Sequence, residues 1–193
     1  MAQLTGSKKI KTAVFISGTG SNLKSLILFS KLKKSPISIN LIISNNSKSK
    51  GLKLGNIFKI KKKIFDFENK NLTETKIISE LKKNKIDLIC LAGFMKILSK
   101  KFINNFKGNI INIHPSLLPK FKGLNTHERA IQNKERYSGC TVHFVNSKLD
   151  SGRIVIQKKV KINKNDTPKT LAKKILTQEH ILYPKAILKI FSL

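Results

Sequence analysis

The chain has 193 residues, with 39 Lys and Arg against 10 Asp and Glu, and a formal net charge of +29. This length predicts one soluble globular domain that buries roughly 70% of the surface of the unfolded chain. No secretory leader and no membrane-length apolar stretch is found, so we expect a cytoplasmic protein with no membrane partner.

The charge of +29 has two interpretations, a nucleic-acid or anionic-membrane partner and compositional drift. Only Arg129, Arg136 and Arg153 are arginines, and lysine, isoleucine and asparagine, which all have A/T-rich codons, are abundant. The lysines are spread along the chain without the interleaved aromatic residues of a nucleic-acid-binding patch. We favour drift and expect no specific nucleic-acid partner.

The first half of the chain alternates short apolar runs with amphipathic ones. In chain order, the patterns predict a strand at 13–17, a helix at 23–32, a strand at 37–43, a short helix at 47–58 interrupted by Gly55, a strand at 64–65, a helix at 71–83, a strand at 87–92, a helix at 99–105 and a strand at 109–113. Asn71 followed by Glu74 resembles a capping box. The alternation predicts an α/β fold, a doubly wound, mostly parallel sheet with helices on both faces.

The second half changes character and shows no repeat or linker. Its patterns predict a helix at 127–133, strands at 140–145 and 154–160, and a helix from 167 towards 191 with a break or kink near Pro184. Cys90 and Cys140 lie in strand-like runs and predict buried reduced thiols. We expect a single domain over 1–193.

Open α/β sheets bind ligands beyond the carboxyl ends of their strands, where loops 18–22, 93–98 and 112–119 are predicted to converge. The first of these loops, Gly18-Thr19-Gly20-Ser21-Asn22, has glycines that let the backbone approach an anion at a helix N-terminus. It lacks the third glycine of a dinucleotide fingerprint and the lysine of a P-loop, so a plain tight turn stays an alternative.

Asn112, His114 and Asp150 carry the chemistry that the loops suggest. A carboxylate beside an imidazole raises the pKa of the imidazole and holds it cationic near neutral pH. A cationic imidazole beside a carboxamide stabilises an oxyanion, as acyl transfer requires. Asp150 also precedes Ser151-Gly152, so a turn residue is an equally good interpretation of it.

The other titratable and nucleophilic residues have plainer interpretations. His143 alternates with apolar neighbours and predicts a satisfied core histidine, whereas His127 and His180 are expected on helices with exposed positions. Cys140 and Ser116 lack a nucleophile-elbow context. No histidine pair has zinc-ligand spacing, so no metal is predicted.

Several motifs occur in order over most of the chain, from residue 11 to the end: Ser17-Gly18-Thr19-Gly20-Ser21-Asn22-Leu23, Leu91-Ala92-Gly93-Phe94-Met95-Lys96-Ile97-Leu98, the run 112–119, Gly123-Leu124-Asn125-Thr126-His127, Thr141-Val142-His143-Phe144-Val145 and Thr177-Gln178-Glu179-His180. With these motifs the chain resembles the phosphoribosylglycinamide formyltransferases, folate-dependent enzymes of purine biosynthesis. The resemblance implies transfer of a formyl group from 10-formyltetrahydrofolate, as co-substrate, to the amine of glycinamide ribonucleotide.

The resemblance also implies roles for individual residues. His114 would be the general acid, Asn112 a second donor to the oxyanion, and Asp150 the group that raises the pKa of His114. The ribonucleotide would be bound by Gly20, Ser21, Asn22, Leu176, Thr177, Gln178 and Glu179, although Glu179 in a surface ion pair is the plainer alternative. The folate would be bound by Met95, Lys96, Ile97, Leu98, Asn112, Asn146, Ser147, Lys148, Leu149 and Asp150, with Lys70 as a further candidate.

On this resemblance, residues 11–110 form the ribonucleotide-binding half and 111–193 the catalytic and folate-binding half of a monomer or homodimer. Lys96 stands where well-known bacterial relatives carry arginine. Methionyl-tRNA formyltransferase and formyltetrahydrofolate deformylase share the Asn-x-His and Asp residues. The first normally adds a C-terminal barrel and the second an N-terminal regulatory domain, and this chain has room for neither.

Overall fold

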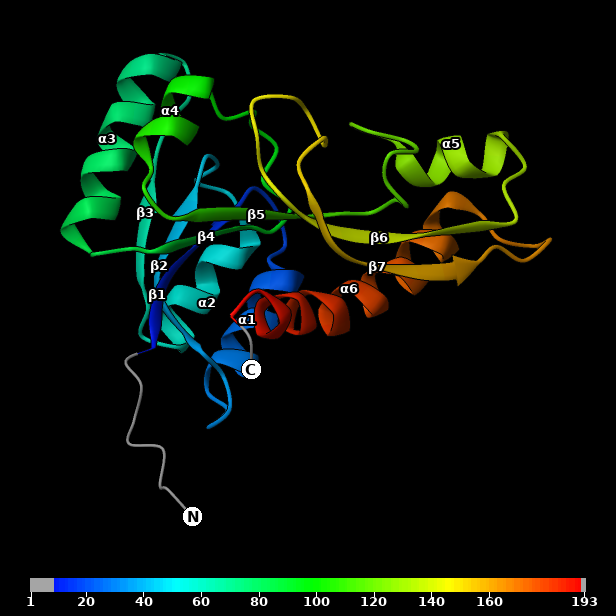
Figure 1. Cartoon of the computed structure of the whole chain (residues 1–193), viewed down its shortest axis with the longest axis horizontal. Helices are drawn as coiled ribbons and strands as arrows, with labels where there is room; N and C mark the ends of the chain where they lie inside the picture. The colour runs from blue at the N-terminus through cyan, green and yellow to red at the C-terminus, as the bar shows by residue number, and fades with distance from the viewer. Residues whose placement is uncertain (1–8, 192–193) are drawn as a thin grey trace.

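The structure, a computed structural model, describes residues 9–191 as one layered α/β unit (Figure 1). Its elements in chain order are β1 (Ile10–Ile16), α1 (Ser21–Ser30), β2 (Ile37–Ser44), the 3₁₀ helix η1 (Lys50–Leu52), α2 (Lys53–Ile57), β3 (Lys61–Ile64), α3 (Lys70–Lys83), β4 (Leu88–Leu91), α4 (Lys100–Asn105), β5 (Asn109–His114), α5 (Thr126–Gln132), β6 (Tyr137–Phe144), β7 (Ile154–Lys161) and α6 (Pro168–Ile190). The predicted order of strands and helices is confirmed.

All seven strands form one sheet in the order β3-β2-β1-β4-β5-β6-β7. The five strands from β3 to β5 are parallel, and β6 and β7 are antiparallel additions at one edge. The mostly parallel sheet confirms the predicted fold class. It places the carboxyl ends of β1, β4 and β5 side by side, and those strands lead into the loops expected to bind ligands.

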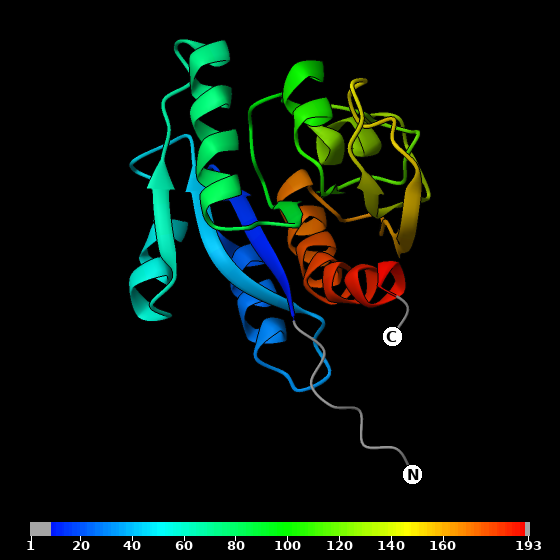
Figure 2. The same ribbon diagram turned by 60° about the vertical axis from the view of Figure 1, so that its left-hand side comes forward.

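The sheet is buried on both faces, because successive side chains of each strand point in opposite directions. Val14 and Ile16 pack with residues of α1 and α6, whereas Ala13 and Phe15 pack with residues of α3 and α4. Figure 2 shows α1 and α3 on opposite sides of the strands. The two hydrophobic clusters hold in place the strands β1, β4 and β5, which lead into the loops expected to bind ligands.

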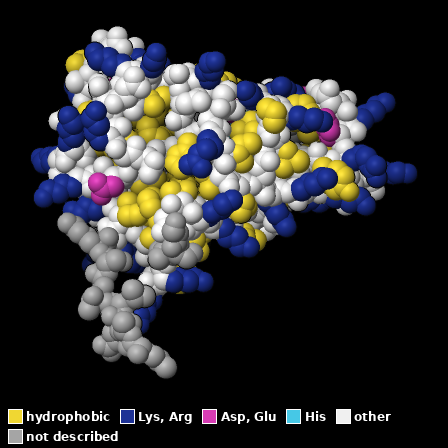
Figure 3. Space-filling model, in the orientation of Figure 1, with side chains coloured by type: hydrophobic (Ala, Val, Ile, Leu, Met, Phe, Trp, Pro, Cys, Tyr) yellow, Lys and Arg dark blue, Asp and Glu magenta, His cyan; other side chains and the backbone are white. Residues whose placement is uncertain are grey.

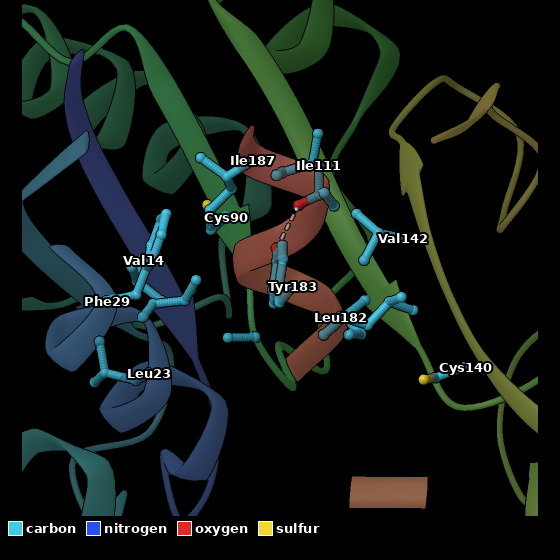
Figure 4. Packing of buried hydrophobic residues seen from close by; sticks show 14 of the residues in the cluster. Val14, Leu23, Phe29, Cys90, Ile111, Cys140, Val142, Leu182, Tyr183 and Ile187 are labelled. Carbon is cyan, nitrogen blue, oxygen red and sulfur yellow. Dashed lines mark hydrogen bonds between the residues drawn. The ribbon is translucent and has the colours of Figure 1, made fainter. Parts of the chain in front are cut away.

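Tyr183 of α6 links the core to the site edge of the sheet. Its ring is fully buried, and its hydroxyl hydrogen-bonds the carbonyls of Leu91 at 3.0 Å and Ile111 at 3.1 Å. Figure 4 shows the ring beside Cys90 and pointing to Ile111. Because Leu91 ends β4 and Ile111 precedes Asn112 in β5, α6 is tied to both strands.

Of the predicted break or kink near Pro184, the break is wrong, because α6 continues through this residue as one helix. Proline has no N–H, so the carbonyl of His180 four residues earlier loses its helical partner. The Ser25 hydroxyl of α1 donates to that carbonyl at 2.7 Å. A side chain from the neighbouring helix therefore replaces the missing backbone donor.

The predicted capping box at Asn71 and Glu74 is also wrong. The N-cap of α3 is Asn69, whose side chain accepts from the Leu72 N–H. Glu74 is buried instead, and its carboxylate accepts from the backbone N–H and the hydroxyl of Ser99, the N-cap of α4. Glu74 therefore bonds Ser99, which is distant in sequence, instead of the backbone at Asn71.

Gly55 does not interrupt a helix, since it lies within α2. A Cβ at Gly55 would lie 3.1 Å from the Ile60 carbonyl oxygen, so glycine permits the close return of the chain into β3. Gly55 is therefore explained by close packing against the Ile60 backbone.

Both cysteines, Cys90 and Cys140, are buried and free, as predicted. Burial raises the pKa of each thiol to about 12, so both stay protonated. None of the helices within residues 9–191 has the length and apolar character needed to cross a bilayer.

Lysine and arginine side chains are scattered over the face of the molecule shown in Figure 3, between patches of apolar and neutral surface. Acidic side chains are sparse on the same face. The lysines on this face do not gather into one stripe.

Candidate active site

The loop after β1 forms a backbone cradle at the start of α1. Gly20 has φ +78°, a left-handed conformation that glycine adopts without strain. A Cβ on Gly20 would lie 2.7 Å from the Cα of Gly51, and one on Gly51 would lie 2.9 Å from the Cα of Gly20. The Gly51 N–H also donates to the Gly18 carbonyl at 3.0 Å. Two glycines in contact therefore set the shape of the turn.

Asn22 brings the C-terminal helix to this turn. Its side-chain nitrogen donates to Glu179 Oε2 at 2.7 Å, and both side chains are buried. The interpretation of Glu179 as a surface ion pair is wrong. Burial raises the pKa of Glu179 to about 7, although the Asn22 amide opposes this.

The predicted ribonucleotide residues of α6 differ in orientation. Leu176 and Gln178 are half-buried, whereas Thr177 is exposed and its hydroxyl donates back to the Lys173 carbonyl. Glu179 alone among them is buried at the Asn22 turn.

The loop after β4 is fastened to the loop after β1. Ser17 donates its backbone N–H to the Gly93 carbonyl at 3.1 Å, and its hydroxyl accepts from the Met95 N–H at 2.8 Å. The same hydroxyl donates to Asn45 Oδ1 at the end of β2. The first two predicted loops thus converge through one serine.

Asn112, His114 and Asp150 meet at the end of β5. Asp150 Oδ2 lies 3.4 Å from His114 Nδ1, and Asp150 Oδ1 lies 3.6 Å from His143 Nε2. The side-chain amide of Asn112 is 3.2 Å from His143 Nε2. The Asp150 side chain is only 7% exposed, so one buried carboxylate lies between two imidazoles.

His143 is the main residue of the candidate site that sequence reasoning missed. It is buried as expected, but β5–β6 pairing places it opposite Asn112 rather than in the apolar core. The Phe144 carbonyl, 2.8 Å from His143 Nδ1, requires a hydrogen on that nitrogen, so in the neutral ring Nε2 accepts from Asn112. Only the antiparallel register, which the sequence does not specify, could have revealed this neighbour.

Asp150 is both a turn residue and a site residue. It has φ +45°, in the left-handed region that aspartate tolerates better than most residues. Its Oδ2 accepts from the Gly123 N–H at 2.9 Å. Burial alone would raise the pKa of Asp150, but the neighbouring His143 ring, the Gly123 N–H and the electrostatic effect of His114 lower it, so the carboxylate is ionised.

The expectation that Asp150 holds His114 cationic needs correction. Burial lowers the pKa of His114, and the Phe121 carbonyl and the Asp150 carboxylate only partly offset this. His114 Nε2 lies 2.9 Å from the Phe121 carbonyl oxygen, which fixes a hydrogen on that nitrogen. The net effect is a pKa of His114 below its usual value, with Asp150 opposing the effect of burial.

Large apolar side chains are exposed on the loops that reach the same edge. They are Met95 at 65%, Ile97 at 63%, Leu124 at 72% and Leu149 at 50%. Leu149 lies close to Gly123, whose Cβ would be 3.7 Å from Leu149 Cδ2. Exposed apolar groups beside a polar cluster are typical of a ligand-binding surface.

The remaining predicted folate residues lie in three settings. Lys96, Asn146, Ser147 and Lys148 are exposed, whereas the side chain of Leu98 is buried in the cluster with α3 and α4. Lys70 is the exposed first residue of α3, one turn before Glu74, which bonds Ser99 after the 95–98 loop.

His127 and His180 are half-buried rather than exposed. Ser116 donates its hydroxyl to the Lys120 carbonyl and Cys140 is buried, in agreement with their structural interpretation. Within residues 9–191, no group of three or more His, Cys, Asp or Glu is arranged to hold a metal ion.

Known proteins resemble this chain in sequence and fold. A family described as Formyl transferase matches residues 10–187. A phosphoribosylglycinamide formyltransferase of Haemophilus influenzae is 42% identical over 180 residues, 92% of this chain and 85% of that protein. The crystal structure of phosphoribosylglycinamide formyltransferase from Brucella melitensis has a TM-score of 0.89 and 41% identity, covering 95% of this chain and 96% of that chain.

The human trifunctional purine biosynthetic protein adenosine-3 is 40% identical over 93% of this chain, which spans only 18% of that protein. The predicted resemblance is confirmed by the family match and by relatives of similar length. This chain belongs to the formyl transferase family.

Proposed function

We propose that this protein transfers the formyl group of 10-formyltetrahydrofolate to the amine of phosphoribosylglycinamide, a step of purine biosynthesis. One observation carries the proposal: the Asp150 carboxylate lies between His114 and His143, beside the Asn112 amide. Acyl transfer passes through an oxyanion, and a carboxamide with an imidazole donor is suited to stabilise it. The relatives named above support the choice of substrates.

The ribonucleotide would bind at the Gly20 turn. The first backbone N–H groups of α1, at Ser21 and Asn22, have no partner within the helix and would donate to the phosphate. Glu179 would lie near the glycinamide amine, and Leu176, Thr177 and Gln178 would line the adjoining part of α6. Asn22, proposed to bind the phosphate, donates a hydrogen bond to Glu179, proposed to lie near the amine. The two residues are therefore close enough to contact the same ligand.

The reaction would proceed by attack of the amine nitrogen on the formyl carbon. The resulting oxyanion would accept hydrogen bonds from Asn112 and His114. His114 would take up the proton that the amine nitrogen gives up, and would pass it to N10 as the bond between the formyl carbon and N10 of the folate breaks. Asp150 would stabilise the imidazolium while it forms, because an adjacent carboxylate favours the charged ring.

The folate would bind along the loops that carry the exposed apolar groups. Met95 and Ile97 on one side and Leu149 on the other would contact the pterin ring, with backbone groups of 95–98 and 146–150 as hydrogen-bonding partners. Lys96, Lys148 and Lys70 are cationic candidates for the glutamate carboxylates, and the side chain of Leu98 would support the loop from the core.

We further propose one domain with no resident cofactor, in a cytoplasmic monomer or homodimer. The division into a ribonucleotide-binding half at 11–110 and a folate-binding half at 111–193 would be approximate. Glu179 belongs to the second half but is hydrogen-bonded to Asn22 of the first half. Met95 belongs to the first half but would contact the folate.

Release of tetrahydrofolate on mixing purified protein, phosphoribosylglycinamide and 10-formyltetrahydrofolate tests the proposal. We expect turnover with this amine, and at least about 100-fold less with methionyl-tRNA or with water as acceptor, because neither fills the Gly20 turn. Equal or faster transfer to either alternative acceptor would contradict the assignment.

A further inference from the structure

The loop 121–125 contacts two of the proposed catalytic side chains through its backbone. The Phe121 carbonyl oxygen lies 2.9 Å from His114 Nε2, and the Gly123 N–H donates to Asp150 Oδ2 at 2.9 Å. The conformation of this loop therefore determines where the imidazole points and how the carboxylate is stabilised.

This loop is backbone-strained. Phe121 has φ +53°, Gly123 has φ +76° and Asn125 has φ +56°. Left-handed conformations cost a non-glycine residue on the order of 1 kcal/mol, most for a bulky side chain such as that of Phe121. Such a loop keeps its shape only when surrounding contacts hold it.

Arg129 of α5 supplies those contacts. Its Nη1 donates to the Lys122 carbonyl at 2.7 Å and to the Leu124 carbonyl at 3.3 Å. Its guanidinium also lies 5.3 Å from the centre of the Phe121 ring. A planar guanidinium suits this combination of carbonyl donation and stacking better than a lysine ammonium does.

We propose that Arg129 is a positioning residue of the reaction, which holds loop 121–125 in the conformation that orients His114 and Asp150. The expected effect of Arg129 on kcat rests on the proposed function. Its effect on the conformation of loop 121–125 rests only on the contacts described above. Arg129 touches neither imidazole nor carboxylate, so its effect passes through the Phe121 carbonyl and the Gly123 N–H.

Arg129 also contributes to the electrostatic surroundings of His114. The ring faces Asp150 from the β6–β7 loop, His143 from β6, and Arg129 and His127 from α5. Burial lowers the pKa of His114 most, and the positive charge of Arg129 lowers it further. Removing this arginine would raise the pKa of His114, through loss of the charge and through entry of water beside a loosened loop.

The test compares Arg129→Met, Arg129→Gln and Arg129→Lys with the wild type. Arg136→Met is the matched control, since it removes the same charge from an exposed position outside the loop. We expect Arg129→Met to lower kcat at least about 10-fold, with KM for the ribonucleotide within about 3-fold, because the turn at Gly20 is untouched. Arg129→Lys should recover more of kcat than Arg129→Gln, since it keeps both the charge and a donor.

A second measurement needs no substrate. The pKa of His114, followed by NMR in the isotope-labelled protein, should rise by about 0.5 or more in Arg129→Met, and stay near the wild-type value in Arg129→Lys and Arg136→Met. Thermal unfolding identifies variants that are merely unfolded.

A kcat for Arg129→Met equal to that of Arg136→Met would overturn the proposal, as would an unchanged pKa of His114 in a folded Arg129→Met protein. If the wild type fails to formylate the ribonucleotide, the proposed function falls, and the NMR comparison alone still decides whether Arg129 controls the His114 environment.

Discussion

Single residues of this protein serve the site mainly through where their backbone places them. Gly20 and Gly51, 31 positions apart, touch because neither carries a Cβ. Asp150 and Phe121 adopt left-handed backbone conformations, and both contribute an oxygen to the surroundings of His114. Sequence reasoning found Gly20 and Asp150 from local patterns. Gly51 and Phe121 have no such pattern, because their importance comes from contacts between distant segments.

Gly51→Ala tests the contact between the two turns. The added Cβ would lie 2.6 Å from Ile16 Cδ1 and 2.9 Å from the Gly20 Cα, so the Gly20 turn must shift. We expect KM for the ribonucleotide to rise about 10-fold or more, with a much smaller change for the folate. Gly18→Ala is the control, because its Cβ would meet no atom within 4 Å. Equal effects of the two variants would refute a role for the contact.

The buried carboxyl group of Glu179 should change how the free energy of unfolding depends on pH. Its pKa is raised to about 7 by burial, so the folded protein binds a proton that the unfolded chain releases near pH 4.5. The free energy of unfolding should therefore fall as pH rises from 4.5 to 7, and level off above 7.

Glu179→Gln removes this proton linkage and keeps an amide that can contact Asn22. Relative to the variant, the wild type should lose up to about 3 kcal/mol across that pH window, measured by urea denaturation. Parallel pH profiles for the two proteins would show that the carboxylate is not buried as described.

At the scale of elements, α6 was predicted in extent but not in continuity. The proline pattern indicated a break or kink, but the helix is unbroken and the Ser25 hydroxyl donates to the freed His180 carbonyl. The cap of α3 was misplaced for a related reason, since Glu74 is bonded to Ser99 of another helix. Buried strands were predicted more reliably, because burial on both faces leaves continuous apolar runs such as Ile89–Leu91. The exposed edge strand β3 overlaps the strand predicted at 64–65 only at Ile64.

A double-mutant cycle tests the α1–α6 contact. Ser25→Ala should lower the free energy of unfolding by about 1–2 kcal/mol, because it leaves the His180 carbonyl without its donor. In a Pro184→Ala background, the new backbone N–H supplies that carbonyl, and the same Ser25→Ala change should cost clearly less. Additive effects of the two substitutions would show that the hydroxyl does not compensate for the proline.

The two sheet edges give part of the lysine excess a structural role. The edge strand β3 carries Lys61, Lys62 and Lys63, and the opposite edge strand β7 carries Lys158, Lys159 and Lys161. Charged side chains on an edge strand discourage pairing with strands of other molecules. Lysine at these positions is therefore consistent with protection of the sheet edges as well as with compositional drift.

For the whole molecule, length and alternation of elements were enough to predict the mostly parallel sheet. The convergence of Asn112, His114 and Asp150 did not follow from strand order alone. Antiparallel pairing places the end of β6 beside the start of β5, and the β6–β7 loop then brings Asp150 back to His114. The position of His143 did not follow, because a one-residue change of the β5–β6 register would turn its side chain to the other face. The downward shift in the pKa of His114 did not follow from the sequence either, because its largest cause is burial, which is a property of the folded molecule.

The net charge of +29 predicts only weak, salt-sensitive association with nucleic acid. Scattered lysines release counterions from any polyanion, so DNA binding at low salt should weaken by orders of magnitude towards about 150 mM salt, as filter binding or fluorescence anisotropy would show. Sub-micromolar, sequence-dependent binding that persists at that salt would instead point to a dedicated nucleic-acid site.

The most direct test of the catalytic arrangement is turnover of Asp150→Asn with phosphoribosylglycinamide and 10-formyltetrahydrofolate. Asp166→Asn is the control, because it removes a carboxylate that pairs with Lys174 away from the site. We predict a loss in kcat of at least about 100-fold for Asp150→Asn, with the fold retained, and a change within about 2-fold for Asp166→Asn. Near-normal turnover of a folded Asp150→Asn protein at every pH from 6 to 9 would contradict the account.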